Sequence, residues 1–254
     1  MSRITERERK TLQAADGINA ILSRLQSGRI GVQKIMLRDS KLSSRLQEIL
    51  DLAEAMNLPI DRVTEKALAN MTNVAHQGVG MALLPPEVKS EVDLFGIIEN
   101  QPGNLLFLVL DGVTDPRNLG ACMRSAATLG VNAVIVPKDN SAPLNDAAVK
   151  TASGGASCVP LVQVVNLSRC LNRMQKENIW IVGTLPDAGQ SIVDVDMTGN
   201  IAIVMGSEGK GLRRNTIKCC DFLANIPMLN DNFGLNVSVA TCICLYEISR
   251  QRLK

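Results

Sequence analysis

Three short segments of the 254-residue chain combine glycine with polar side chains that could hold a ligand. The first, residues 111–124, contains Asn118. The second, residues 205–211, reads Met-Gly-Ser-Glu-Gly-Lys-Gly, and the third, residues 226–240, carries Asn236 between apolar neighbours. A buried asparagine needs partners for its amide, and glycines allow the backbone to come close to a ligand or to another part of the chain. The residue types therefore favour a site built from hydrogen-bonding side chains and exposed main chain.

The first segment follows a predicted strand and opens a helix, which is the place where parallel α/β sheets bind ligands. Asn118 is expected to cap this helix, and Arg124 follows six residues later on a different face. A capped surface helix with an exposed arginine explains the same spacing. The segment alone leaves both interpretations open.

The glycines of the second segment do not form a known nucleotide fingerprint. Their order is G-x-x-G-x-G rather than G-x-G-x-x-G, and Gly211 stands where a Walker loop needs Ser or Thr after its lysine. A dinucleotide or triphosphate site is therefore poorly supported, and a Rossmann dehydrogenase is excluded. Glu208 either serves a ligand or is a solvated charge, and Asn236 either serves a ligand or braces the last helix.

Composition narrows the class of protein further. Hydrophobic residues make up 46% of the chain, enough for a normal core, but aromatic residues make up only 2%, which disfavours a base-stacking platform. The net charge is +2, so contacts to nucleic-acid phosphates would have to be local. Seven cysteines without paired zinc spacing and the single His76 predict no metal site and reduced thiols, as in a cytoplasmic protein. No apolar stretch approaches 18 residues, so we expect no membrane span and no signal peptide.

Hydrophobic periodicity and charge divide the chain into four parts. We expect a charged extension at 1–15, a small α/β domain at 16–84, an acidic linker with one short helix inside it at 85–103 and a larger α/β domain at 104–254. The larger domain begins with the continuous apolar run 105–110, which is typical of a parallel strand buried on both faces. Further strands are expected at 133–136, 159–162, 180–183, 201–205 and 222–226, and a final helix at 237–252.

Taken in order, the three segments resemble the three motifs of the SpoU branch of the SPOUT RNA methyltransferases. The matching patterns are N-x-G-x-x-x-R, M-G-S-E-G-x-G-L, and I-P-M followed by L-N-V-S-V-A. Gly17-Ile-Asn-Ala and His76-Gln-Gly-Val are similar to the small substrate-binding domain of the family, so the resemblance covers residues 16–252. It implies a trefoil-knotted α/β methyltransferase domain, preceded by a small α/β (L30e-like) RNA-binding domain.

The resemblance also implies a cofactor and a reaction. S-adenosyl-L-methionine would contact Gly206, Ile226 and Leu235, with Gly183 and Thr184 as weaker candidates. The reaction would methylate a ribose 2′-hydroxyl of RNA, with a guanosine of 23S rRNA as the expected target. A tRNA 2′-O-methyltransferase is the alternative within the same chemistry. An RNA-binding ribosome-assembly factor with little catalysis is the alternative from another class.

Four residues match the catalytic positions of the family. Arg124 would engage the hydroxyl or a neighbouring phosphate, while Asn118, Glu208 and Asn236 would orient Arg124 and the ribose. Because arginine holds its proton in proteins, a cation that stabilises the developing alkoxide is favoured over a general base. The family pattern further implies a homodimer in which Arg124 serves the partner's cofactor site.

Two positions depart from the family pattern. Gly234 stands where relatives commonly have Ser, and Asn19 where they often have His. The first change makes a catalytically weak paralogue conceivable. The small domain would grip folded RNA through local cations such as Arg38, Lys41 and Arg45.

Overall fold

The computed structural model of the chain describes residues 17–26, 32–40, 42–71, 77–83, 86–101, 103–230 and 234–253. The chain divides into two compact units, Met1–Pro85 and Pro86–Lys254. The expected extension at 1–15, together with Lys41 and His76, lies outside the described residues. Among the described residues, no helix is both long and apolar enough to cross a membrane.

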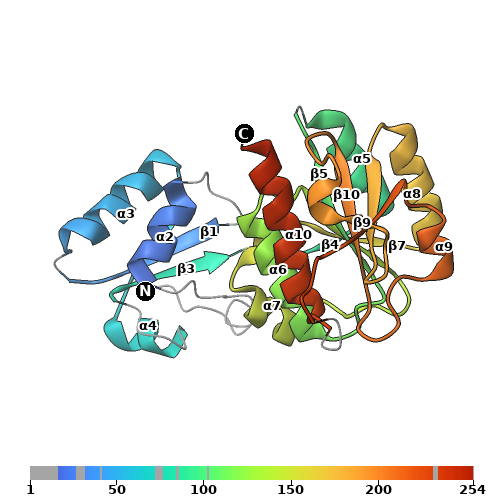
Figure 1. The fold of residues 1–254 in the computed structure, drawn as a ribbon. Coiled ribbons are helices and arrows are strands. Elements are labelled where there is room, and N and C mark those ends of the chain that lie inside the picture. The colour runs from blue at the N-terminus through green and yellow to red at the C-terminus, as the bar shows by residue number, and fades with distance from the viewer. Residues whose placement is uncertain are drawn as a thin grey trace. The chain divides into compact units, whose positions relative to one another are not determined.

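The first unit contains a three-stranded sheet with the order β2-β1-β3. The central strand β1 (Val32–Arg38) pairs in parallel with β2 (Ile60–Val63) and antiparallel with β3 (Val79–Leu83). The sheet is packed against three helices, α2 (Gly17–Gln26), α3 (Ser44–Ala55) and α4 (Glu65–Met71) (Figure 1). Apolar stripes on α2 and α3 bury Ile21, Leu25, Leu46 and Ile49, in agreement with the helical period of these side chains in the sequence.

The second unit is built on an eight-stranded sheet whose neighbouring strands are all parallel. Its order is β4-β7-β6-β5-β10-β8-β11-β9. The strands are β4 (Val88–Lys89), β5 (Leu106–Asp111), β6 (Ala133–Pro137), β7 (Leu161–Val164), β8 (Trp180–Thr184), β9 (Gln190–Ser191), β10 (Ile201–Gly206) and β11 (Phe222–Asn225).

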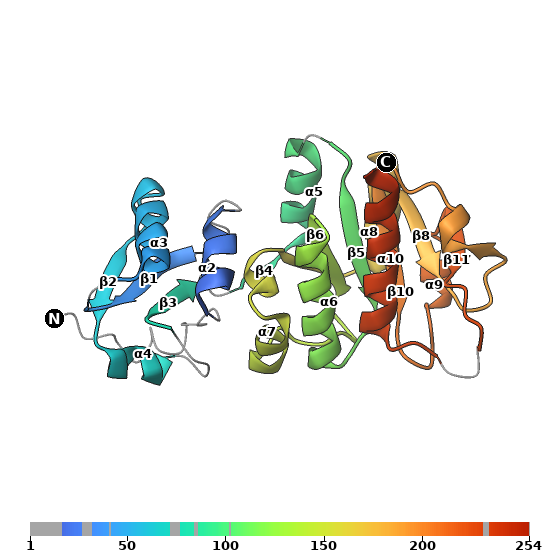
Figure 2. The same ribbon diagram turned by 60° about the vertical axis from the view of Figure 1, so that its left-hand side comes forward.

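Helices cover both faces of this sheet, as the alternation along β5 shows. Leu108 and Leu110 point into a core formed with α6 (Pro116–Thr128), α7 (Asp146–Ala152) and α10 (Val237–Arg252). Phe107 and Val109 point into a second core with α5 (Glu91–Asn100) and α8 (Leu167–Lys176), and α9 (Arg214–Ile217) lies beside α8 (Figures 1 and 2). Burial on both faces explains why the strands read as continuous apolar runs rather than alternating ones.

The segment expected as a linker with one short helix, 85–103, contains that helix but also adds a strand to the sheet of the second unit. Residues 88–89 form strand β4, which pairs with β7, and residues 91–100 form α5, whose Leu94 and Phe95 are buried. Two of the acidic side chains, Glu91 and Asp93, belong to the first turn of this helix, where Ser90 and Asp93 form a reciprocal capping box. Acidic residues in a first turn also interact favourably with the helix dipole. The charges therefore mark a helix terminus and not a solvated connector.

The strand order changes direction next to β5. From β5 the chain proceeds through β6 to β7 on one side, and it then places β8, β9, β10 and β11 on the other side. Strands β5 and β10 consequently lie next to each other although about ninety residues separate them. Such a switch point, at the carboxyl ends of the strands, is where open α/β sheets form a ligand crevice.

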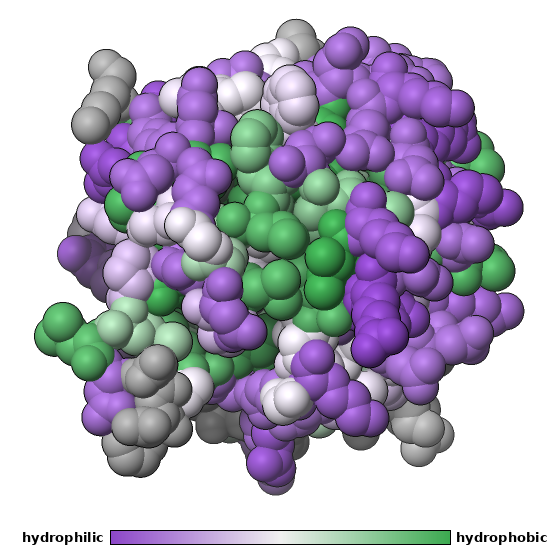
Figure 3. Space-filling view, turned by 45° about the vertical axis from the view of Figure 1, so that its right-hand side comes forward, coloured by the Kyte–Doolittle hydropathy of each residue, from purple (hydrophilic) through white to green (hydrophobic). Residues whose placement is uncertain are grey.

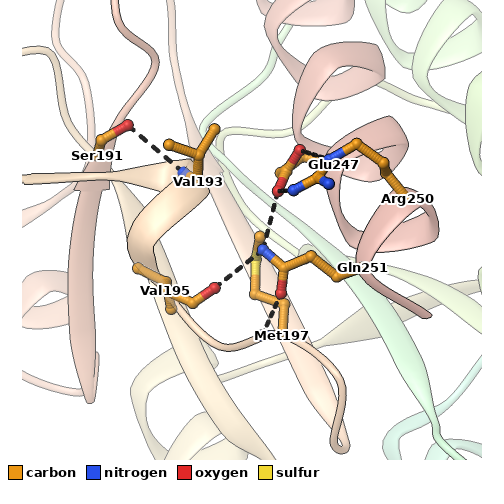
Figure 4. Close-up of polar contacts among 7 residues, drawn as sticks. All are labelled: Ser191, Val193, Val195, Met197, Glu247, Arg250 and Gln251. Atoms are coloured by element: carbon orange, nitrogen blue, oxygen red, sulfur yellow. Dashed lines mark hydrogen bonds and ion pairs between the residues drawn. The ribbon is translucent and has the colours of Figure 1, made fainter. Parts of the chain in front are cut away.

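The last turn of α10 is tied to the segment that follows β9 (Figure 4). Gln251 donates to the main-chain oxygen of Val195 at 3.0 Å and accepts from the main-chain nitrogen of Met197 at 2.9 Å. Arg250 donates twice to the carboxylate of Glu247, at 2.7 Å each. Arg252 adds hydrogen bonds to the main-chain oxygens of residues 104, 105, 197 and 199. The end of the helix is thus fixed by side-chain to main-chain bonds.

Candidate functional site

Asn118, Glu208 and Asn236 meet at the carboxyl end of the sheet of the second unit. The Oε1 atom of Glu208 accepts from Asn118 Nδ2 at 3.1 Å and from Asn236 Nδ2 at 2.6 Å. Asn236 Nδ2 also lies 3.1 Å from Asn118 Oδ1, and the main-chain nitrogen of Val237 donates to Glu208 at 3.3 Å. Three segments that are far apart in the sequence therefore supply one hydrogen-bonded cluster.

Asn118 does not cap helix α6, contrary to the sequence-based expectation. Asp115 is the cap: its side chain accepts from the main-chain nitrogen of Arg117 at 2.8 Å, and Pro116 occupies the first helical position. Proline favours that position because its missing N–H would have no partner there. Asn118 lies in the first turn with its amide free to reach Glu208.

Gly206 and its neighbours form a tight loop that presents Glu208. The main-chain groups of Ser207 and Gly211 exchange hydrogen bonds of 3.1 and 2.9 Å, and Gly209 and Gly211 have positive φ. A Cβ atom at Gly206 would lie 2.6 Å from the nitrogen of Leu212 and closer still to the carbonyl carbon of Gly211. The glycines of this segment therefore allow the loop to fold back on itself.

Asn236 both braces helix α10 and joins the polar cluster. Its Oδ1 atom accepts from the main-chain nitrogen of Ser238 at 2.9 Å and from Ser238 Oγ at 2.6 Å, which caps the helix. Its Nδ2 atom points to Glu208 and Asn118. The bracing role that the sequence left open is present, and the same amide has a donor left for the polar cluster.

A pocket of about 440 Å³ opens beside this cluster. Loops after β8, β10 and β11 and the start of α10 supply its lining: residues 184–187, 205–211, 226, 228, 234, 235, 237 and 240. Of the residues expected to contact a cofactor, Gly206, Ile226, Leu235 and Thr184 lie in the lining. Gly183 does not lie in the lining. It is packed inside the unit, where a Cβ atom would press on Cys220, Leu212 and Leu223. Gly183 therefore has a packing role in this structure.

Several lining residues were not expected from the sequence. Leu185, Pro186 and Asp187 follow β8, and Lys210 stands among the glycines of the 206–211 loop. The strand order supplies the missing signal, since a loop after a strand next to β10 must share the same sheet edge. Met228, in the Ile-Pro-Met pattern, also lies in the lining.

Arg124 lies apart from the polar cluster. It is exposed on α6, and its side chain makes no hydrogen bond or ion pair with any residue that the structure describes. It is not part of the pocket lining. Gly155 packs against its backbone, where a Cβ would lie 3.0 Å from the Cα of Arg124. The helix is therefore held firmly while the guanidinium stays accessible.

The cysteines near the site are not activated thiols. Cys122 donates to Thr241 Oγ1 at 3.5 Å behind the polar cluster, and burial raises the pKa of its thiol to about 11. Burial likewise raises the pKa of Cys244 to about 12. Because only the thiolate is a nucleophile, neither residue supports covalent catalysis at neutral pH. Within the described ranges, no three His, Cys, Asp or Glu side chains are grouped as a metal site would require.

Comparison with known proteins assigns the chain to a family. Residues 105–246 match the SpoU rRNA Methylase family. Residues 16–88 match the RNA 2′-O ribose methyltransferase substrate binding family. The chain belongs to the SpoU rRNA methylase family. The resemblance expected from the motifs of the sequence is confirmed.

Relatives of this SpoU-family protein match it over almost its whole length. It is 43% identical to the 23S rRNA (guanosine-2′-O-)-methyltransferase RlmB of Xanthomonas campestris pv. campestris, over 93% of this chain and 96% of the relative. It is 45% identical to the protein of the same name from Pasteurella multocida, with the same coverage of each chain. Among solved structures, the SpoU methyltransferase AviRb from Streptomyces viridochromogenes, in complex with AdoMet, aligns with a TM-score of 0.68 at 23% identity. That alignment covers 99% of this chain and 95% of the other, and it confirms the expected α/β fold.

Proposed function

We propose that this SpoU-family protein methylates a ribose 2′-hydroxyl of RNA with S-adenosyl-L-methionine, and that the target is a guanosine of 23S rRNA. The observation that carries the proposal is the meeting of Asn118, Glu208 and Asn236 beside the 440 Å³ pocket. The proposed substrate is that named for the 23S rRNA (guanosine-2′-O-)-methyltransferases, which are 43 to 45% identical to this protein over 93% of its length. Their coverage includes both units, so the RNA-binding part of the relatives has its counterpart here.

The pocket fits the proposed cofactor in size and in chemistry. Its volume lies within the range of about 300–1,000 Å³ that small-molecule sites occupy. Apolar side chains such as Leu185, Ile226 and Leu235 suit a purine ring, and the glycine loop offers main-chain groups for hydrogen bonding. Glu208 and Asp187 add negative charge to the lining, which suits a sulfonium cation. When bound, S-adenosyl-L-methionine supplies an electrophilic methyl group.

The side chains of the cluster orient the nucleophile. A ribose hydroxyl is a weak nucleophile and must lose its proton as the new C–O bond forms. Glu208 fixes the amides of Asn118 and Asn236 in one arrangement, which leaves a defined edge of the cluster for the ribose. Arg124 binds a phosphate next to the target ribose and stabilises the developing alkoxide, because it carries a permanent positive charge.

The position of Arg124 supports a homodimer. Its side chain is exposed and lies outside the pocket lining of its own chain, so a second copy would receive it. Helix α10 offers a surface for that contact, since Val239, Ile243 and Tyr246 are 47, 37 and 61% exposed at a helical spacing. Figure 3 shows hydrophobic surface gathered on one face and surrounded by hydrophilic side chains. Exposed apolar surface of this kind is typical of interaction sites.

The two units divide the work between them. We assign residues 16–84 to RNA binding, with Arg38 and Arg45 among the cations that contact folded RNA. Arg45 donates to Asn19 Oδ1 at 2.9 Å, so the residue that replaces the expected histidine is in place to orient it. Residues 104–254, extended by β4 and α5, form the methyltransferase unit, and family membership supports a trefoil knot within it. We propose a cytoplasmic location, which an rRNA substrate supports.

Methyl transfer to defined RNAs tests the proposal. Labelled S-adenosyl-L-methionine is offered with an unmodified fragment of the 23S peptidyl-transferase region, a full tRNA and a 16S fragment, using the wild type and Arg124→Ala. We expect label on the 23S fragment alone, mapped to one guanosine ribose and lost in the variant. Label on the tRNA alone would show that tRNA and not 23S rRNA is the substrate. Wild-type activity of Arg124→Ala would show that Arg124 has no part in the reaction.

The absence of label on every RNA would favour the ribosome-assembly factor. Gly234 is the observation behind that alternative, because it lines the pocket and, by the resemblance of the motifs, stands at the position of a serine in the family pattern. No described atom lies within 4 Å of a Cβ placed there, so Gly234→Ser fits without strain. The serine variant would then regain activity if the missing hydroxyl is the cause. If Arg124→Ala and Asn236→Ala are each inactive alone, activity in a mixture of the two variants would support a site shared between two copies, since one site of a mixed dimer then keeps both residues.

A further inference from the structure

A second pocket of the same unit differs from the first in its chemistry. It has a volume of about 320 Å³ and is lined by residues 165–168, at the start of α8, and 213–216, at α9. None of the eight lining residues is acidic, whereas Arg213 and Arg214 are cationic and Asn166, Ser168 and Asn215 are polar. This composition favours an anion with several hydrogen-bond acceptors.

The two arginines of this pocket are held differently. Arg213 forms an ion pair with Asp111, which is fully buried at the end of β5, and its main-chain nitrogen donates to the same carboxylate at 3.1 Å. Its charge is thereby balanced and its position fixed. The side chain of Arg214 has no ion pair or hydrogen bond with any residue in the described part of the chain. The pocket therefore carries one cation that its own surroundings do not neutralise.

Thr216 is an independent indication of a ligand. Its side chain lines the pocket and is only 1% exposed, yet its hydroxyl has no hydrogen-bond partner among the described residues. The hydroxyl oxygen is not among the fully buried atoms that lack a partner, so it keeps access to the space of the pocket. A group bound in the pocket would supply that partner.

The start of helix α8 adds to the attraction for an anion. Asn166 caps this ten-residue helix by accepting from the main-chain nitrogen of Arg169 at 3.0 Å. The first turn of a helix carries partial positive charge on its free N–H groups, and phosphates are common ligands there. The pocket is thus bordered on one side by the start of α8 and on the other by Arg214 and Thr216.

We propose that this pocket binds a phosphodiester group of the RNA substrate, held by Arg214 and by the hydroxyl of Thr216; the identity of the ligand rests on the proposed function. The segment 206–216 connects the two pockets, since residues 206–211 line the first and residues 213–216 line the second. The phosphate bound here therefore belongs to a nucleotide near the methylated one. A neutral donor and a cation together recognise phosphate without reading the base.

The salt dependence of RNA binding tests the contact of Arg214. Binding of the 23S fragment to the full-length protein is measured at several salt concentrations for the wild type, Arg214→Ala and Lys176→Ala. Lys176 is the matched control, because it is an exposed cation at the opposite end of α8. We expect Arg214→Ala to bind several-fold more weakly and to lower the slope of log K against log salt by about 0.7–0.9. Equal effects of the two variants would overturn the proposal.

Thr216→Val tests the buried hydroxyl without a change of charge or shape. We expect weaker RNA binding, an unchanged salt slope and an unchanged melting temperature, because the hydroxyl has no hydrogen bond within the described part of the chain to lose. A lower melting temperature with unchanged RNA affinity would assign the hydroxyl a structural role and refute its part in the site.

Inorganic phosphate separates this proposal from the proposed function. At constant ionic strength, phosphate should raise the melting temperature of the wild type and of Lys176→Ala but not that of Arg214→Ala. If no RNA is methylated or bound while this difference persists, the anion site stands and the RNA function fails. If RNA is methylated but Arg214→Ala changes neither RNA affinity nor the effect of phosphate on the melting temperature, the phosphate site is refuted. The proposed methyltransferase function is then unaffected.

Discussion

Replacement of Gly206 by alanine should disrupt the pocket that we propose for the cofactor, because the added methyl group clashes with the main chain. Gly206 ends β10 and lines the pocket, and its φ does not require glycine. The added Cβ would lie 2.6 Å from the nitrogen of Leu212 and closer still to the carbonyl carbon of Gly211. These are main-chain atoms, so no side-chain rotation relieves the contact.

The size of the effect follows from the displacement. Ordinary van der Waals contact begins at 3.4 Å, so residues 211–212 must move away by about 1 Å. That movement breaks the pair of main-chain hydrogen bonds between Ser207 and Gly211, at a cost of about 1–3 kcal/mol in unfolding free energy. It also displaces Glu208, and a 1 Å displacement of a positioning group can lower kcat/KM by about 100-fold.

Gly234→Ala is the matched control, because it adds the same methyl group to the same pocket. No described atom lies within 4 Å of its Cβ position. Titration calorimetry with S-adenosyl-L-methionine, thermal unfolding and methyl transfer to RNA should show a large loss for Gly206→Ala and near wild-type values for Gly234→Ala. A Gly206→Ala protein that binds the cofactor and turns over normally would refute the steric argument, as would equal losses in both variants.

Three further predictions concern other parts of the second unit. Glu208→Gln should lower kcat/KM by about tenfold or more, since the charged acceptor shared by Asn118 and Asn236 is lost; unchanged kinetics would contradict this. Gly120→Ala should destabilise the unit by about 1–3 kcal/mol in urea unfolding, because its Cβ would press on the main-chain oxygen of Ala148, while the exposed-loop change Gly199→Ala should not. The free energy of unfolding should fall as pH rises above about 8.5, because buried thiols whose pKa is raised to about 11 or 12 stay protonated in the folded state while the unfolded thiols ionise. Urea midpoints at pH 8 and pH 10 measure this fall in stability, and Cys122→Ala should make it smaller. Equal midpoints at the two pH values would contradict the raised pKa of the buried thiols.

Long or strongly patterned elements could be predicted from the sequence. The continuous apolar run at 105–110 becomes β5 at Leu106–Asp111, and the last helix lies at Val237–Arg252 as expected. Three polar residues spread over 119 positions were expected to act together, and the cluster of Asn118, Glu208 and Asn236 joins them. The three residues follow or flank strands of one parallel sheet, and parallel strands have all of their carboxyl ends at one edge. Their order in the sequence therefore predicts that they meet.

Short elements and loop contacts could not be predicted in the same way. Strand β9 has two residues and helix α9 has four, which is too few for a hydrophobic period to be visible. The cap of α6 was misassigned because Asp115 and Asn118 are both good capping residues, and the decisive signal was Pro116 between them. The lining at 185–187 depends on strand order, which no local pattern of side chains encodes.

The hydrogen bonds at the end of α10 also set the order of events while the protein is being synthesised. Arg252 donates to the main-chain oxygen of Leu105, next to the first residue of β5, so two positions 147 residues apart must both be present for this contact. Domains generally fold as units and N-terminal ones first during translation. The first unit can therefore fold on the nascent chain, whereas the second must wait until β10 and α10 have left the ribosome. The pocket comes into existence only at that late stage, so a partly made chain lacks the site that we propose for S-adenosyl-L-methionine.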